Sequence, residues 1–167
     1  MVPKIIFIAG TPCTGKTTLA RGIAVEIPSA FLMEKDDINT SLSQVRPTTN
    51  GNLPPADEYL KTQYTEIGND EFGPVIRLPK RQEFFGRHVR DQTYEVMIDV
   101  AKRNLDLGKS PILESLLTRQ FTENSGISVA EGIWKRFGNN KRIMIFAYLP
   151  EDELKKRMIE RMEVDPE

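Results

Sequence analysis

The chain has 167 residues, with 23 Lys and Arg against 24 Asp and Glu, one His and one Cys. This length is typical of one domain and allows a full hydrophobic core without disulfides. The hydrophobic (39%) and charged (28%) fractions exclude a wholly disordered chain, and the net charge of −1 gives no global field that would favour nucleic acid or membranes. The start lacks a signal-peptide pattern, and no apolar run approaches the ~20 residues of a membrane span. We therefore expect a soluble, cytoplasmic protein with no membrane partner.

Apolar runs alternate with helical patterns along most of the chain. Strands are expected over 4–10, 30–33, 111–115 and 142–149, and helices over 16–27, 38–45, 87–107 and 151–163. Continuous rather than alternating apolar strands are typical of a parallel sheet covered on both faces, so the fold class is α/β. We expect a single domain over 1–167, with an ordered, Pro- and Gly-rich excursion at about 44–92 that includes one short helix near 56–66.

The turn after the first strand carries the most specific motif. Residues 10–17 read G-T-P-C-T-G-K-T and match G-x-x-x-x-G-K-[ST] at every fixed position. Backbone N–H groups of such a loop, and the helix that starts there, surround a phosphate. Lys16 is expected on the β- and γ-phosphates, and Thr17 on the Mg²⁺ that bridges them. The loop predicts nucleoside triphosphate binding by Gly10, Thr11, Pro12, Cys13, Thr14, Gly15, Lys16, Thr17 and Thr18; a Gly-rich turn that matches by chance is the alternative.

An acidic pair, Asp36 and Asp37, follows the second expected strand. Ligands of open α/β sheets lie beyond the carboxyl ends of the strands. A carboxylate there can accept the proton of a hydroxyl that attacks the γ-phosphate. We expect Asp36 to be this base and Asp37 to contact the substrate, while N-capping of the helix over 38–45 is the competing explanation for either residue.

These motifs, with Lys35-Asp36-Asp37-Ile38 and the arginines of the last helix, resemble those of small P-loop kinases. The similar branch contains chloramphenicol phosphotransferase, zeta-toxin-like kinases and the kinase domain of polynucleotide kinases. The resemblance implies a three-layer P-loop NTPase sandwich, with a parallel sheet in the kinase strand order and helices on both faces. It also implies ATP-dependent transfer to a hydroxyl, with the first Asp of the pair as base. A fifth strand and a final helix are implied too, so either the C-terminal part of the fold is missing or the nucleotide site is closed in another way.

Further site residues are expected after the third and fourth strands. Glu114 stands where the family often carries Asp, and we expect it to hold Mg²⁺, partly through water, unless it is a solvated strand end or pairs with Arg119. Arg119 is expected to contact the substrate. Arg157 and Arg161 are four residues apart, hence on one helix face, and match the lid arginines of the family. An ordinary ion pair between Glu153 and Arg157 on a solvated helix is the alternative.

A basic stripe lies within the excursion and comprises Arg77, Lys80, Arg81, Arg87, His88 and Arg90. It suggests an anionic acceptor, such as a phosphorylated metabolite or a nucleic acid end. A solvated face whose side-chain stems pack on Phe84 and Phe85 is the slightly favoured alternative, so a nucleic acid end is not the preferred acceptor.

The expected function is transfer of the γ-phosphate of ATP, with Mg²⁺, to a hydroxyl of a small molecule or nucleotide-like acceptor. One alternative is an ATPase or GTPase that couples hydrolysis to a conformational switch, although the sequence has no guanine-reading N-K-x-D motif. The other is a non-catalytic nucleotide-binding module. The sequence predicts neither the acceptor, the preference for ATP over GTP, nor the oligomeric state.

Overall fold

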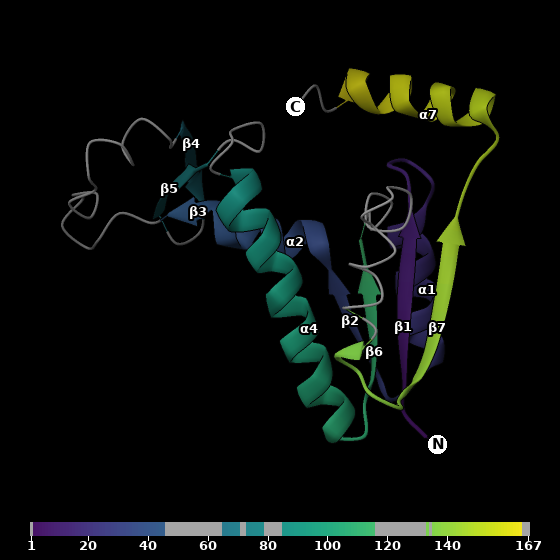
Figure 1. Ribbon diagram of the computed structural model, residues 1–167. Helices are drawn as coiled ribbons and strands as arrows, with labels where there is room; N and C mark the ends of the chain where they lie inside the picture. Colours follow the sequence, from purple (N-terminus) through teal and green to yellow (C-terminus); the bar gives the residue numbers. More distant parts are fainter. Residues whose placement is uncertain are drawn as a thin grey trace. The chain divides into compact units, whose positions relative to one another are not determined.

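The computed structural model describes residues 2–45, 65–70, 73–78, 85–115, 133 and 135–164 (Figure 1). The chain divides into two compact units, one formed by Met1–Lys35 with Met97–Glu167 and the other by Asp36–Val96. The second unit includes the whole range of the excursion expected from the sequence, about 44–92. The expectation of a single domain stays a prediction.

The first unit is built on a four-stranded parallel sheet with the order β2-β6-β1-β7. The strands are β1 (Lys4–Gly10), β2 (Ala30–Glu34), β6 (Ser110–Glu114) and β7 (Lys141–Ala147). The two central strands, β1 and β6, are buried almost throughout, which explains why their sequences are continuously apolar. All four expected strands and their parallel arrangement are confirmed.

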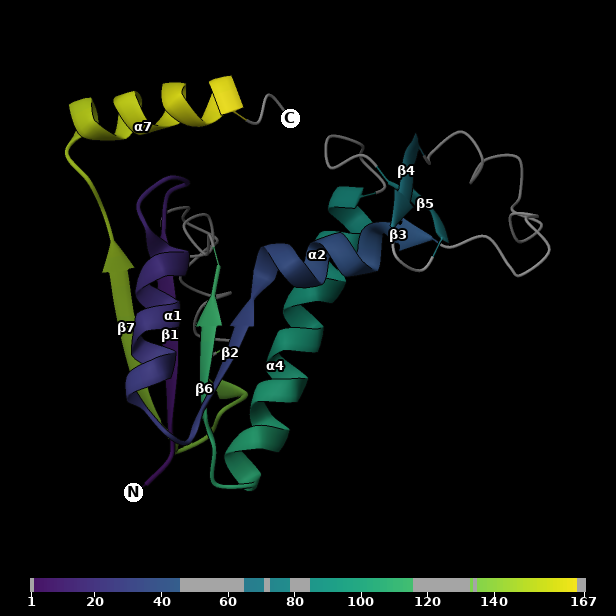
Figure 2. The ribbon, with the colours of Figure 1, turned by 180° about the vertical axis from the view of Figure 1, so that it is seen from behind.

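Helices cover both faces of this sheet. Helix α1 (Lys16–Glu26) packs through Ala20 on a cluster that contains Ile8 and Ile112. On the opposite face Phe7 meets Phe137 edge-on, with ring centroids 5.9 Å apart. The last turns of α4 (Asp91–Asp106) also lie on that face (Figures 1 and 2). The expected three-layer α/β fold is therefore confirmed.

Two helices end at positions with a clear physical cause. The helix α1 stops one residue before Ile27 and two before Pro28, which cannot continue it. Gly108, at φ +77°, follows α4 in the left-handed conformation, and its N–H donates to the carbonyl of Leu105 at 2.9 Å. The chain then enters β6 directly.

The last helix, α7 (Glu151–Val164), follows β7 and buries none of its residues. Its first turn is acidic and its last turn carries Arg161, an arrangement that favours a helix through its dipole. None of the helices in the described part of the chain combines the length and the apolar character that a bilayer crossing requires.

The second unit differs from the sequence expectation. It contains α2 (Lys35–Ser43), an antiparallel sheet of order β3-β5-β4 and the π-helical turn η1 (Phe85–Arg90), which continues into α4. The strands are β3 (Gln44–Val45), β4 (Thr65–Asp70) and β5 (Gly73–Arg77). They were not predicted, because they are short and contain Gly and Pro. The helix expected near 56–66 is wrong at 65 and 66, which belong to β4, and the rest of it lies outside the described residues.

A small core and a buried hydrogen bond hold the second unit together. Leu78, Phe85 and Val89 form an apolar cluster. Thr93, fully buried in α4, donates from its hydroxyl to the side-chain oxygen of the buried Asn39 in α2, at 2.6 Å. Burying both polar groups is tolerable because each satisfies the other.

Candidate phosphate-binding site

The loop over residues 10–17 lies between the carboxyl end of β1 and the first turn of α1. It enters through Gly10, which has φ +148°, and a Cβ built there would lie 2.2 Å from the carbonyl oxygen of Ala147 in β7. Gly15 has φ +83°, and Cys13, with φ +64°, is the non-glycine left-handed residue of the loop. Both glycines of the motif therefore have backbone conformations that a side chain would strain.

The first turn of α1 is suited to bind an anion. Gly15 is its N-cap and supplies no side-chain cap, and the turn contains no acidic residue. The N–H groups of a helix's first turn have no partner within the helix, and its dipole attracts negative charge. A phosphate at this position would satisfy both.

Lys16 is held inside the loop. Its side chain is 9% exposed, and Nζ donates to the carbonyl of Thr11 at 2.7 Å. The hydroxyl of Thr14 donates to the same carbonyl at 2.8 Å. Two side chains of the motif thus converge on one backbone oxygen and keep the loop wrapped around the lysine.

Glu114 faces this lysine from the neighbouring strand. Its Oε1 lies 4.0 Å from Nζ of Lys16, and its side chain is 6% exposed. Burial excludes the solvated strand end that the sequence left open. Arg119, the partner in the other alternative, lies outside the described residues. The structure therefore brings Lys16 and Glu114 together, while the roles of Glu114 with Mg²⁺ and of Arg119 with substrate stay predictions.

The acidic pair follows β2 directly. Asp36 and Asp37 are exposed and occupy the first turn of α2, which starts at Lys35, three residues before the expected start. Capping of a helix over 38–45 is therefore wrong as an explanation, because both carboxylates lie inside the helix. They still favour its N-terminus through the dipole. Both residues belong to the second unit, so their roles toward substrate stay predictions.

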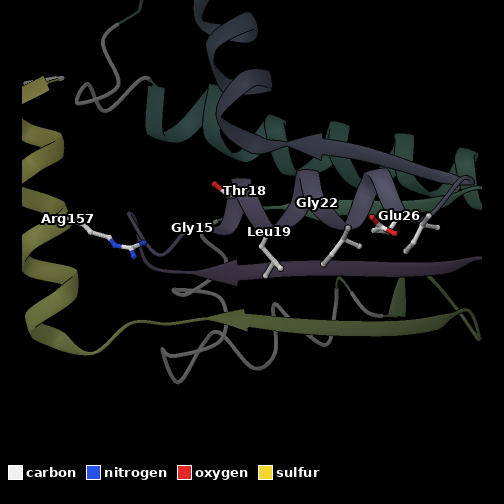
Figure 3. Close-up of a pocket in the computed structure, with 8 residues that line it drawn as sticks. Gly15, Thr18, Leu19, Gly22, Glu26 and Arg157 are labelled. Carbon is white, nitrogen blue, oxygen red and sulfur yellow. The ribbon is translucent and has the colours of Figure 1, made fainter.

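A cavity of about 800 Å³ runs along α1 from the phosphate loop (Figure 3). The guanidinium of Arg157, on α7, extends toward the loop end at Gly15 in this view. Arg161 is exposed and is not among the lining residues. The lining residues are Gly15, Thr18, Leu19, Gly22, Ile23, Glu26, Ile27 and Arg157.

The expected pair between Glu153 and Arg157 is present. Nε of Arg157 donates to Oε1 of Glu153 at 2.8 Å. This hydrogen bond, with the positive charges of Arg157 and Lys156, lowers the pKa of Glu153 below its ordinary value of 4.5. The pair and a ligand role are compatible, because Arg157 presents only one edge of its guanidinium to Glu153.

The sequence did not predict an ion pair that joins α1 to β2. Arg21 donates from Nε and Nη2 to the two carboxylate oxygens of Glu34, at 2.7 and 2.8 Å. Glu34 is the last residue of β2, so the pair ties the helix to the strand before the acidic pair. The two residues are 13 positions apart, and no helix or strand periodicity predicts a contact at that spacing. Only the tertiary structure brings them together. Of the basic stripe, the structure describes the side chain of Arg90 alone, which is exposed.

Solved structures share this fold. A "putative kinase" from Chloroflexus aurantiacus J-10-fl is 20% identical, with a TM-score of 0.59 over 99% of this chain and 70% of its own. A chain of the Pnkp1/Rnl/Hen1 RNA repair complex is 14% identical, with a TM-score of 0.54 over 98% of this chain and 39% of its own. No family model and no curated protein sequence matches the chain. At these identities the likeness shows the α/β fold alone.

Proposed function

We propose that this protein transfers the γ-phosphate of ATP to a hydroxyl group of a small molecule or nucleotide-like acceptor. The observation that carries the proposal is the buried Lys16 at the start of α1, enclosed by its loop and 4.0 Å from the buried Glu114. A buried ammonium at the N-terminus of a helix, where the helix dipole attracts negative charge, matches the needs of a polyphosphate chain. The name of the neighbour from Chloroflexus supports a phosphotransferase.

Each proposed residue has a distinct part. The backbone from Gly10 to Thr18 binds the phosphates, and Lys16 exchanges the Thr11 carbonyl for the β- and γ-phosphate oxygens. Asp36 accepts the proton of the acceptor hydroxyl as the hydroxyl oxygen attacks the γ-phosphorus, the bond from that phosphorus to the β,γ-bridging oxygen breaks, and ADP leaves. Asp37 helps to orient the acceptor. Arg157 and Arg161 neutralise charge that develops on the phosphoryl group. Most of the acceleration comes from positioning and electrostatics, because phosphoryl transfer needs little covalent chemistry from the protein.

The residues present suit a magnesium ion. Mg²⁺ prefers oxygen ligands and is commonly bound by one or two protein groups together with phosphates and water. The hydroxyl of Thr17 and the carboxylate of Glu114 would hold it, the latter partly through water. Glu114 lies 4.0 Å from Lys16, so its carboxylate is close to the loop that would bind the phosphates. When bound, the ion neutralises charge on the β- and γ-phosphates.

The test combines nucleotide binding with an acceptor screen. Calorimetry with ATP and Mg²⁺ is expected to show binding to the wild type and a loss of roughly tenfold or more in Lys16→Ala. ADP release is then measured with hydroxyl-bearing metabolites, nucleosides, antibiotics and 5′-hydroxyl oligonucleotides. Asp36→Asn should lower acceptor-dependent turnover by about 10²–10⁴-fold with unchanged ATP affinity. Asp106→Asn, an exposed carboxylate at the end of α4, is the matched control and should change neither.

Three results would argue against the proposal. Absence of any nucleoside triphosphate binding to the folded protein removes its basis. Phosphate release that no acceptor changes indicates a hydrolase instead. Full transfer activity in Asp36→Asn shows that another group takes the proton.

A further inference from the structure

Helix α2, whose first turn carries the acidic pair, is buried through polar side chains. Lys35, Asn39 and Ser43 are 5%, 4% and 1% exposed, and their four-residue spacing places them on one helix face. Leu42, by contrast, is 41% exposed. Apolar packing, which has no preferred direction, therefore contributes little on the buried face of α2. Hydrogen bonds, whose strength depends on direction, are left to set how the helix is rotated about its axis.

Hydrogen bonds join α2 to other parts of the second unit. At the last residue of the helix, the carbonyl of Ser43 accepts from the N–H of Leu78 at 2.9 Å. Nearer to its start, the side-chain oxygen of Asn39 lies 2.6 Å from the hydroxyl of Thr93 in α4, and Figures 1 and 2 show α2 beside the first turns of α4. The same hydroxyl lies 2.8 Å from the carbonyl oxygen of Val89, one turn earlier, and this contact holds the χ1 angle of Thr93. Thr93 is therefore a fixed partner for Asn39.

The contact between Asn39 and Thr93 is close to Asp36 along the helix. Asn39 follows Asp36 by three residues, a rise of about 4.5 Å, whereas Ser43 follows it by seven. Side chains extend roughly 5–6 Å from a helix axis, so a rotation of α2 by about 10° would move the Asp36 carboxylate by about 1 Å. A misplacement of about 1 Å can lower the rate of an enzyme by about 10²-fold. A hydrogen bond that fixes this rotation therefore controls how well Asp36 can act as a base.

We propose that Asn39 and Thr93 are positioning residues, which fix the rotation of α2 and thereby the place of the Asp36 carboxylate. This role rests on the proposed function, in which Asp36 accepts the proton of the acceptor hydroxyl. Neither Asn39 nor Thr93 contacts the reacting groups, and both act through the helix that carries the base. The pair therefore controls the transfer step and leaves nucleotide binding to the loop over residues 10–17.

The experiment measures ADP release from ATP with Mg²⁺ by the full chain, and the acceptor is the compound of the screen above that gives the highest rate. Thr93→Val keeps the shape of the side chain but removes its hydroxyl. This variant should lower kcat by about 10–10²-fold, with ATP affinity and the KM for the acceptor within about threefold of the wild type. Thr93→Ser keeps the hydroxyl and should retain kcat within about threefold.

A double variant separates positioning from stability. In Thr93→Val the buried amide of Asn39 loses its partner, so the urea midpoint should fall by about 0.5–1.5 M. Asn39→Leu combined with Thr93→Val replaces both partners by apolar groups, so the midpoint should return to within about 0.5 M of the wild type while kcat stays low. Asn104→Ala removes a hydrogen bond to the carbonyl of Val100 near the other end of α4 and is the matched control. It should lower the midpoint by about 0.5 M and leave kcat unchanged.

The outcomes distinguish the positioning role from the proposed function. An unchanged kcat in Thr93→Val overturns the positioning role, and so does a kcat that recovers together with stability in the double variant. Equal losses of kcat in Asn104→Ala and Thr93→Val also overturn it, because stability alone would then explain the effect. If Thr93→Val does not fold, the double variant and Thr93→Ser decide in the same way. A wild type that transfers phosphate to no screened compound overturns the proposed function and the positioning role with it.

Discussion

Replacing Gly10 by alanine tests how closely the phosphate loop is built against the edge strand. The added Cβ would lie 2.2 Å from the backbone oxygen of Ala147, whereas real Cβ atoms stay beyond 3.0 Å. The atom it meets is backbone, in a strand that pairs with β1 through Gly10 itself. Removing this clash therefore requires β1 and β7 to move apart where the loop begins.

Two costs add in this variant. A non-glycine residue at φ +148° stores about 1–3 kcal/mol of backbone strain. Overpacking of the kind produced by the clash costs about 1–3 kcal/mol more. We expect the free energy of unfolding to fall by about 3–4 kcal/mol, within the summed range of about 2–6 kcal/mol.

Two glycines of the same unit provide controls. Gly108 has φ +77° with nothing within 4 Å of a built Cβ. Gly108→Ala should therefore introduce backbone strain alone and lower the free energy of unfolding by about 1–2 kcal/mol. Gly22 has neither penalty, and Gly22→Ala should gain roughly 0.5–1 kcal/mol from helix propensity.

The stability of the wild type and the variants is measured by urea unfolding, with circular dichroism as the signal. With a slope of about 2 kcal/mol/M, the midpoint should fall by about 1.5–2 M in Gly10→Ala and by about 0.5–1 M in Gly108→Ala. Equal losses in these two variants would refute the argument, because only Gly10 faces a backbone oxygen. Gly10→Ala should also lose ATP binding, since the displaced strands carry the loop.

Two further predictions concern single hydrogen bonds. Thr14→Val removes the donor to the Thr11 carbonyl but keeps the side-chain shape, and should cost about 1 kcal/mol in urea unfolding; an unchanged midpoint would show that the bond does not stabilise the loop. The pKa of Glu153 is depressed by Arg157, so the pair stabilises α7 above pH 4.5 and is lost as the pH falls through the lower pKa of the folded state. Carboxyl titration by NMR should find this midpoint below 4.5 in the wild type and closer to 4.5 in Arg157→Ala, and the same midpoint in both would contradict the contact.

Local patterns were sufficient for much of the first unit. The phosphate motif and the continuous apolar strands are properties of neighbouring residues, and Gly108 ended α4 as its conformational freedom predicts. The antiparallel strands of the second unit were missed because their hydrogen bonds join segments with weak strand propensity of their own. The start of α2 was misplaced by three residues, since polar residues at a helix start can serve as caps or as members of the first turn.

The sequence alone determined the parallel α/β class and the position of the glycine-containing loop over residues 10–17, because spacing along one strand, one turn and one helix encodes both. Only the tertiary structure decided which partners complete the site. Parallel pairing of β1 with β6 places Glu114 beside Lys16, and pairing with β7 makes Gly10 sterically necessary. The cavity between α1 and Arg157 likewise joins residues far apart in the chain. Contacts of this kind depend on how elements pack, which no local pattern of residues specifies.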